Sequence, residues 1–286
     1  MIGITCQGGV QRLVAKASGM SHMKGFAGVT TNELPGKAAG SSVRSVQTAL
    51  RLLDALAEHS PCGVGELARR LGVPKSTAHR GLQTLEAAGW ASVDDHGRYS
   101  VTAHLLSLGL MASRESGLHE AAFPEMEKLR DQTGETIHLT VRDNQAAVLV
   151  LRAEGTHHVR TMLPLGTRVP LYASSSGHAI LASLPDEEVE GILAAIDKGG
   201  RSSSMGRSEV WRSVRSAREV GYTVRTQSRQ GVVGIGSLIT SQVTPDRAAI
   251  TVSFPIQRKD RWSEEELGPL VRQAAQRASR SWRTSS

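Results

Sequence analysis

The residues best suited to contact a polyanion lie between positions 74 and 84. Pro74-Lys75-Ser76-Thr77 would open a helix with small hydroxylated and basic side chains in its first turn. Amide groups and side chains at the start of such a helix can meet phosphates and base edges in a DNA major groove. The side chains that we expect to contact DNA are Lys75, Ser76 (as a helix cap or a phosphate contact), Thr77, His79, Arg80, Gln83 and Thr84.

A helix-turn-helix pattern surrounds this segment. Val64–Leu71 predicts a short helix, Gly72-Val73-Pro74 predicts a turn, and apolar residues from Val46 to Ala57 predict an earlier helix that ends near His59. The apolar face of the polar helix should pack against leucines of the other two: Ala78, Leu82 and Leu85 against Leu53, Leu56 and Leu67. Gly81 costs this helix about 1 kcal/mol relative to alanine. It either permits a close helix approach or weakens the unit.

A short hairpin follows the two helices. Trp90–Val93 and Arg98–Val101 flank Asp94-Asp95-His96-Gly97, in which Gly97 is free to take positive φ. Arg98 is a further candidate for a phosphate contact. Three helices and a hairpin predict a winged helix-turn-helix domain over residues 42–103. For any single residue, an ordinary helical hairpin with a solvated polar face remains an open alternative.

The remaining chain predicts a linker helix and an α+β domain. Residues 104–119 have too broad an apolar face for a solvent-exposed spacer, so we expect this helix to pack also against a partner chain. Residues 120–286 interleave helices and strands without regular βαβ spacing. The expected helices are Ala121–Thr133, Ser176–Leu184, Asp186–Ala195, Glu209–Glu219 and a last one capped by Ser263. The expected strands are Thr136–Arg142, Ala146–Arg152, Val159–Leu163, Arg168–Tyr172, Tyr222–Arg225, Gly234–Thr240 and Ala248–Phe254.

Composition limits the remaining possibilities. The formal net charge of +7 over 286 residues lies mainly in the two terminal segments, so it supports polyanion binding only weakly. Residues 1–41 are rich in Gly, Ser, Thr and Lys and predict a disordered arm. Cys6 and Cys62 are too far apart for a metal-ligand spacing, and free thiols suit a reducing compartment. No signal or membrane-spanning segment is evident. We therefore expect a cytoplasmic protein that has no membrane partner.

Taken in order, the motifs from Val43 to Trp282 resemble those of IclR-family transcriptional regulators. No single motif identifies the family, but the whole set in this order does. The motifs that carry the resemblance are Ser45-Val46-Gln47-Thr48-Ala49-Leu50-Arg51-Leu52-Leu53, Glu66-Leu67-Ala68, Pro74-Lys75-Ser76-Thr77, His79-Arg80, Gly134-Glu135-Thr136-Ile137-His138-Leu139, Pro170-Leu171-Tyr172-Ala173-Ser174, Gly177, Ala179-Ile180-Leu181-Ala182, Gly221-Tyr222 and Ser253.

The resemblance implies a winged helix-turn-helix joined by a linker helix to a GAF-like effector-binding domain with a curved antiparallel sheet. It also implies a homodimer or homotetramer that binds a double-stranded DNA operator and responds to a small-molecule effector, commonly an organic acid. The effector-binding residues that it implies are Tyr172, Ser174, Ser175, Ser176, Gly177, Gly234, Thr251 and Ser253. Hydroxyls, amides and the helix dipole would meet after Ser174, which suits a carboxylate. A serine-rich helix cap without a ligand is the alternative.

One segment and one single position depart from the family pattern. Members often carry an acidic run after Gly221-Tyr222, whereas this chain has Arg225-Thr226-Gln227-Ser228-Arg229-Gln230, and Gly234 stands where the family often has cysteine. We hypothesise a more anionic ligand with Arg225 as its counter-ion, so Arg225 joins the candidate effector residues.

Other functions are less consistent with the sequence. Ser174–Ser176 with His178 could form a nucleophile and base, but no Gly-x-Ser-x-Gly motif or orienting carboxylate accompanies them, so we do not expect an enzyme. His138, His157, His158 and His178 lack metal-ligand spacing, and neighbouring strand residues point to opposite faces. We expect no metal and no cofactor. A co-regulator that lacks its own DNA contacts remains a third possibility.

Overall fold

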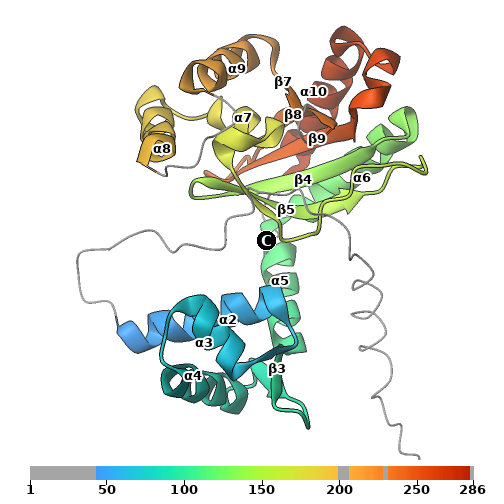
Figure 1. The fold of residues 1–286 in the computed structure, drawn as a ribbon. Helices are drawn as coiled ribbons and strands as arrows, with labels where there is room; N and C mark the ends of the chain where they lie inside the picture. Colours follow the sequence, from blue (N-terminus) through green and yellow to red (C-terminus); the bar gives the residue numbers. More distant parts are fainter. Residues whose placement is uncertain (1–42, 199–205, 228–230, 284–286) are drawn as a thin grey trace, which may run out of the picture.

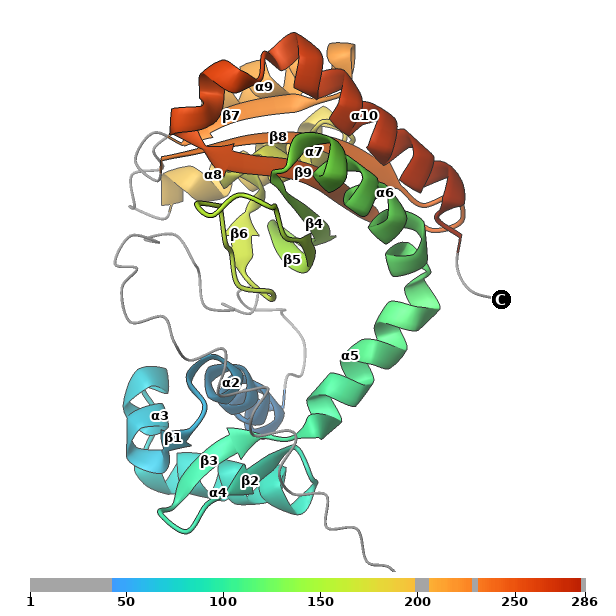
Figure 2. The same cartoon turned by 90° about the vertical axis from the view of Figure 1, so that its right-hand side faces the viewer.

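The computed structural model describes residues 43–198, 206–227 and 231–283, and the arm expected at 1–41 lies outside them. A small N-terminal body and a larger C-terminal body lie at opposite ends of helix α5 (Ala103–Ser116) (Figures 1 and 2). The architecture is therefore the α+β arrangement that the sequence predicts, with a linker helix between its two parts.

The N-terminal body is a winged helix-turn-helix. Its elements are α2 (Arg44–His59), β1 (Cys62–Gly63), α3 (Val64–Leu71), α4 (Lys75–Ala87), β2 (Ala91–Val93) and β3 (Arg98–Val101). The hairpin β2–β3 is confirmed, and the two-residue strand β1 adds a third member that the sequence did not predict, in the order β1-β3-β2. All three strands run antiparallel. The wing is thereby attached to the chain just before α3.

The core of this body confirms the expected packing, with one change in register. Of the predicted core residues, Leu56, Leu67, Ala78, Leu82 and Leu85 are buried in one cluster, but Leu53 is only partly buried and Leu52 is fully buried instead. Gly81 is explained by the same leucine: a Cβ at position 81 would lie 2.5 Å from the Leu52 Cδ1 atom. Glycine therefore permits α4 to approach α2 closely, which is the first of the two expected roles.

The linker helix α5 is unusual because none of its residues is buried. Thr102 caps its start by accepting a hydrogen bond from the amide of His104, and Gly117, with φ of 63°, ends it. Three large apolar side chains are more than half exposed: Leu106 (64%), Leu110 (62%) and Met111 (61%). The helix then passes into α6 (Leu118–Thr133), which packs on the C-terminal sheet.

A six-stranded, curved antiparallel sheet forms the C-terminal body (Figure 2). Its order is β6-β5-β4-β9-β8-β7. The strands are β4 (Thr136–Asp143), β5 (Ala146–Ala153), β6 (Arg168–Pro170), β7 (Thr223–Gln227), β8 (Val232–Thr240) and β9 (Arg247–Pro255). The central strands β4 and β9 are more than a hundred residues apart in the chain, so the middle of the sheet depends on a long-range pairing.

Helices cover both faces of this sheet. Helices α6 and α10 (Glu264–Ser281) pack on one face, while the 3-10 turn η1 (Leu171–Ala173) and helices α7 (Ser175–Leu181), α8 (Asp186–Lys198) and α9 (Arg207–Val220) lie on the other (Figure 1). Successive side chains of strand β9 therefore point alternately to the two faces of the sheet. Ile250, Val252 and Phe254 join the core under α6 and α10, whereas Thr251 and Ser253 face the opposite side.

Most predicted elements are confirmed, and Ser263 caps α10 in a capping box with Glu266. One strand prediction is wrong. The expected strand Val159–Leu163 lies in a loop over residues 154–167, and Arg168–Tyr172 is a three-residue strand followed by η1. The loop includes His157 and His158, so the strand argument about their directions does not apply. Arg152 and Arg258 hold this loop by donating hydrogen bonds to the carbonyl groups of Leu163 and Val159.

Candidate functional sites

The polar face of α4 is open to solvent. All seven side chains predicted to contact DNA from this helix are exposed, while its apolar face is buried; they are Lys75, Ser76, Thr77, His79, Arg80, Gln83 and Thr84. The N-cap is Pro74, and no side chain caps the helix, so Ser76 is not the cap that the sequence offered as one of its two roles. The first-turn amides of such a helix lack intrahelical acceptors. They are therefore available to an external anion.

An open groove lies between the start of α4 and the wing. It is lined by the first residues of α3 and α4 and by the hairpin: Val64, Gly65, Lys75, Ser76, His79, Val93, Gly97 and Tyr99. Two helix N-termini thus border one surface hollow, and helix N-termini favour negative charge. No acidic residue lies in the first turn of α4. The groove can accommodate a phosphate backbone beside the polar face of α4.

Arg98 has an internal partner in the structure. Its Nη2 group donates to the carbonyl of Pro61, and its amide donates to a carboxylate oxygen of Asp94 at 2.8 Å. The latter bond, together with one from the amide of His96, lowers the pKa of Asp94 and closes the turn of the wing. Arg98 is exposed, but it also fastens the wing to the segment before α3.

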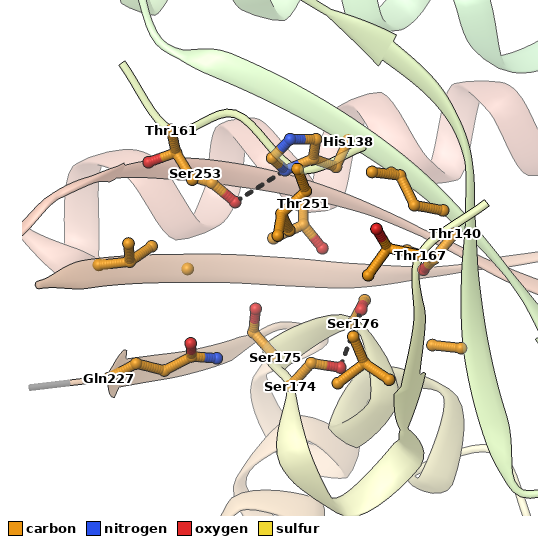
Figure 3. Close-up of a pocket in the computed structure, with 16 residues that line it drawn as sticks. His138, Thr140, Thr161, Thr167, Ser174, Ser175, Ser176, Gln227, Thr251 and Ser253 are labelled. Carbon is orange, nitrogen blue, oxygen red and sulfur yellow. Dashed lines mark hydrogen bonds between the residues drawn. The ribbon is translucent and has the colours of Figure 1, made fainter. Parts of the chain in front are cut away.

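A small cavity of about 80 Å³ lies between the sheet and α7 (Figure 3). Six of the nine residues predicted to bind an effector line it: Ser174, Ser175, Ser176, Gly234, Thr251 and Ser253. Sequence reasoning missed the other lining residues: His138, Thr140, Ala147, Leu149, Thr161, Leu163, Thr167, Val169, Gln227 and Val232. None of these described lining residues carries a formal charge.

The three serines have different roles. Ser174 is the N-cap of α7: its Oγ accepts from the amide of Gly177 at 3.0 Å and lies 3.1 Å from the Oγ of Ser176. The helix-cap interpretation therefore holds for Ser174. Ser175 lies over β8, where a Cβ at position 234 would be only 2.5 Å from the Ser175 Oγ atom. Gly234 is thus required by close packing in this chain.

Tyr172, Gly177 and Arg225 do not line the cavity. Tyr172 packs beside the core formed by η1 and helices α7–α9. Gly177 lets α7 contact the preceding turn, because an added Cβ would lie 2.0 Å from the Leu171 carbonyl oxygen. Arg225 lies opposite Gly234 across β7–β8, and desolvation lowers its pKa while the charge of Glu209 opposes this shift.

His178 is fully buried in α7, and both of its ring nitrogens have partners. Because a carbonyl can only accept, Nε2 donates to the Tyr172 carbonyl at 2.9 Å. In the neutral ring, Nδ1 then accepts from the Ser213 hydroxyl at 2.9 Å. Burial lowers the pKa of His178 to about 4. The ring therefore links η1 to α9, and its nitrogens are engaged away from the serines that the enzyme alternative would pair with it.

His138 differs from His178 in one respect. Its Nδ1 lies 3.0 Å from the Ser253 hydroxyl, but its Nε2 is buried without a hydrogen-bond partner. His138 is therefore neither a surface residue nor a core residue with all of its hydrogen bonds formed. The sequence does contain a sign of this lining, because polar and apolar residues alternate along both strands. His138 and Thr140 on β4, and Thr251 and Ser253 on β9, alternate with apolar residues that belong to the core.

The described residues hold neither a metal-binding cluster nor a membrane-spanning helix. No three or more of their His, Cys, Asp or Glu side chains are arranged for a metal ion. No helix among them has the length and apolar character needed to cross a membrane.

Comparisons with known proteins match both bodies. Residues 45–95 match the IclR helix-turn-helix domain, and residues 111–280 match the bacterial transcriptional regulator IclR C-terminal family. The chain is 28% identical over 244 residues to the transcriptional repressor IclR of Escherichia coli K12, covering 83% of this chain and 89% of that protein.

Two other comparisons agree with this result. The chain is 31% identical over 220 residues to the HTH-type transcriptional repressor AllR of the same strain, covering 74% of this chain and 80% of that protein. A solved IclR homolog from Microbacterium hydrocarbonoxydans, complexed with 4-hydroxybenzoate, has a TM-score of 0.70 at 23% identity and covers 84% of this chain and 100% of that one. This structure shares the fold.

Proposed function

The chain belongs to the IclR family of bacterial transcriptional regulators, and from this premise we propose that a small organic acid in the C-terminal cavity controls operator binding by α4 and the wing. The observation that carries the DNA-binding part is the uncapped, solvent-exposed start of α4 beside the groove. Lys75 and Arg80 are its principal cationic contacts. Ser76, Thr77, His79, Gln83 and Thr84 supply further contacts.

The effector part is supported by the cavity and its polar lining. Ser174, Ser175, Ser176, Gly234, Thr251 and Ser253 surround it. A bound organic acid would replace solvent at these hydroxyl groups and stabilise one arrangement of the sheet and α7. The homolog crystallised with 4-hydroxybenzoate makes that compound a reasonable first probe.

We propose that a second copy of this chain covers α5. Leu106, Leu110 and Met111 are exposed on this helix, and Val46 (54% exposed) and Leu50 (49%) are exposed on α2. These five side chains would leave a large apolar area in water if the chain acted alone. A two-fold dimer would bury them and present two α4 helices to the two halves of a palindromic operator.

The experiment that tests DNA binding is a mobility-shift titration with DNA upstream of the protein's own gene. Lys75→Ala and Arg80→Ala should each weaken binding and reduce the slope of log affinity against log salt by about one for each phosphate that is no longer neutralised. Arg215→Ala removes an exposed cation from α9 in the other body and should change neither quantity. Unchanged affinity and salt slope in both α4 variants would reject this surface.

The same assay tests control by an effector. Titration with 4-hydroxybenzoate and other organic acids should change the fraction of DNA bound by the wild-type protein. Simple saturable binding without consumption of the acid is expected, and turnover would favour the enzyme alternative. A protein that never binds DNA but dimerises would favour the co-regulator alternative.

A further inference from the structure

Three buried polar atoms around the cavity have no hydrogen-bond partner: His138 Nε2, Thr161 Oγ1 and Thr251 Oγ1. In Figure 3 these three residues lie on one side of the cavity, across from Ser174, Ser175 and Ser176. A buried polar group that lacks a partner costs about 1–3 kcal/mol. Three such groups around one cavity are therefore candidate hydrogen-bonding partners for a ligand.

The three atoms can all act as donors at once. His138 and Thr251 are direct cross-strand neighbours on β4 and β9, so their side chains lie on the same face. When the Ser253 hydroxyl donates to Nδ1 of His138, the neutral ring carries its proton on Nε2. Each threonine hydroxyl can rotate to donate as well. Three donors in the lining of one cavity suit the two oxygens of a carboxylate, which accept several hydrogen bonds.

Another part of the cavity lining is apolar. Ala147 on β5 pairs with Val169 on β6, and Leu149 follows on the same face of β5. Leu163 from the loop and Val232 from β8 extend the apolar lining. A second carboxylate on the same ligand would meet either these side chains or neutral hydroxyl and amide groups, and a buried charge without a counter-charge is costly.

Building on the function proposed above, we propose that the cavity selects a small monocarboxylate with an apolar body, and that His138 determines this specificity by donating from Nε2 to the carboxylate together with Thr161 and Thr251. The apolar body lies against Ala147, Leu149 and Val169. Dicarboxylates and phosphorylated acids are disfavoured because no cationic side chain among the described lining residues would balance their second charge.

The protonation state of His138 is consistent with this role. Burial, followed by the charge of Arg152, lowers its pKa to about 4. The imidazole is therefore neutral near pH 7 and acts as a hydrogen-bond donor without a formal charge.

The test measures binding of matched acids to the full chain by calorimetry and by the shift in unfolding temperature. The probes are two pairs, butyrate with succinate and benzoate with terephthalate. At least one monocarboxylate should bind, at least tenfold more tightly than its dicarboxylate partner. His138→Leu should lower its affinity at least tenfold, and His138→Gln should restore part of that affinity because its amide can donate from a similar place.

The controls distinguish the removal of a ligand hydrogen bond from a failure to fold. Thr133→Val removes an equally buried hydroxyl, which donates to the Leu129 carbonyl at the end of α6, and should leave ligand preference unchanged. Circular dichroism and ligand-free DNA binding identify variants that fail to fold. Equal or tighter binding of dicarboxylates, unchanged affinity in His138→Leu, or no binding of either monocarboxylate overturns the assignment. In each case retained operator binding would leave the proposed DNA-binding function intact.

Discussion

Replacing Gly234 with alanine should destabilise the protein only while Ser175 keeps its hydroxyl. The added Cβ would lie 2.5 Å from Ser175 Oγ, but 3.5 Å from Ser175 Cβ and 3.6 Å from Thr251 Cγ2. The first distance is a clash, and the other two are ordinary contacts. A single oxygen atom therefore accounts for the requirement for glycine on this strand.

The magnitude follows from two opposing effects. Overpacking a buried site costs about 1–3 kcal/mol, whereas replacing glycine inside a strand returns about 0.5–1 kcal/mol. We expect Gly234→Ala to destabilise the fold by about 1–2 kcal/mol, which lowers the unfolding temperature by about 2–8 °C for a domain of this size. In a Ser175→Ala background the clash is absent. The same Gly234→Ala change should then be neutral or stabilising by about 0.5 kcal/mol.

Thermal unfolding of the four proteins in this double-mutant cycle provides the assay. Gly191→Ala is the control, because an added Cβ on this α8 residue meets nothing within 4 Å and should stabilise the helix in either background. The reasoning is refuted if Gly234→Ala has the same effect with and without the Ser175 hydroxyl. Equal effects would mean either that Ser175 rotates away freely or that some other contact requires glycine.

Three further predictions concern other parts of the molecule. Burial holds the pKa of His178 at about 4, below its ordinary 6.5, so the unfolded chain takes up the proton first. The stability that this residue contributes is complete above about pH 6.5 and is lost as the pH falls toward 4. His178→Gln should therefore make the fall in unfolding temperature over that range shallower, while the share that comes from His138 remains. Gly81→Ala should destabilise the N-terminal body despite its better helix propensity, because overpacking against the Leu52 Cδ1 atom costs more than the gain of about 1 kcal/mol, and a rise in unfolding temperature would contradict this. Trp282→Phe removes the indole N–H that donates to the Ser116 carbonyl at 2.7 Å, and chemical denaturation should show a destabilisation of about 1 kcal/mol.

The N-terminal body was largely predictable because its structure is local. Helical periodicity, the turn glycine at position 72 and the hairpin residues each act within a few positions of the chain. The part that local periodicity did not predict is which apolar residues of α2 are buried. Val46 and Leu50 fit the helical repeat, yet they are exposed, and Leu52 takes the core position instead. Periodicity identifies an apolar face but does not say which molecule covers it.

The cavity was harder to predict because it depends on pairings between distant segments. His138 and Thr251 are neighbours only because β4 pairs with β9. Thr161 was assigned to a strand because apolar residues flank it, but that segment forms a loop held by Arg152 and Arg258. The serine segment was predicted from the family resemblance, and local chemistry left its role open, since a helix cap and a ligand-binding loop use the same residue types.

The two buried histidines show why composition does not distinguish a structural residue from a binding residue. Both rings are buried, and burial lowers the pKa of each to about 4. His178 has partners at both nitrogens, so its hydrogen bonds are complete within the fold. His138 has a partner at Nδ1 only. A ligand oxygen at Nε2 would replace the missing internal partner, and because that bond exists only in the folded state, ligand affinity and folding stability must rise together.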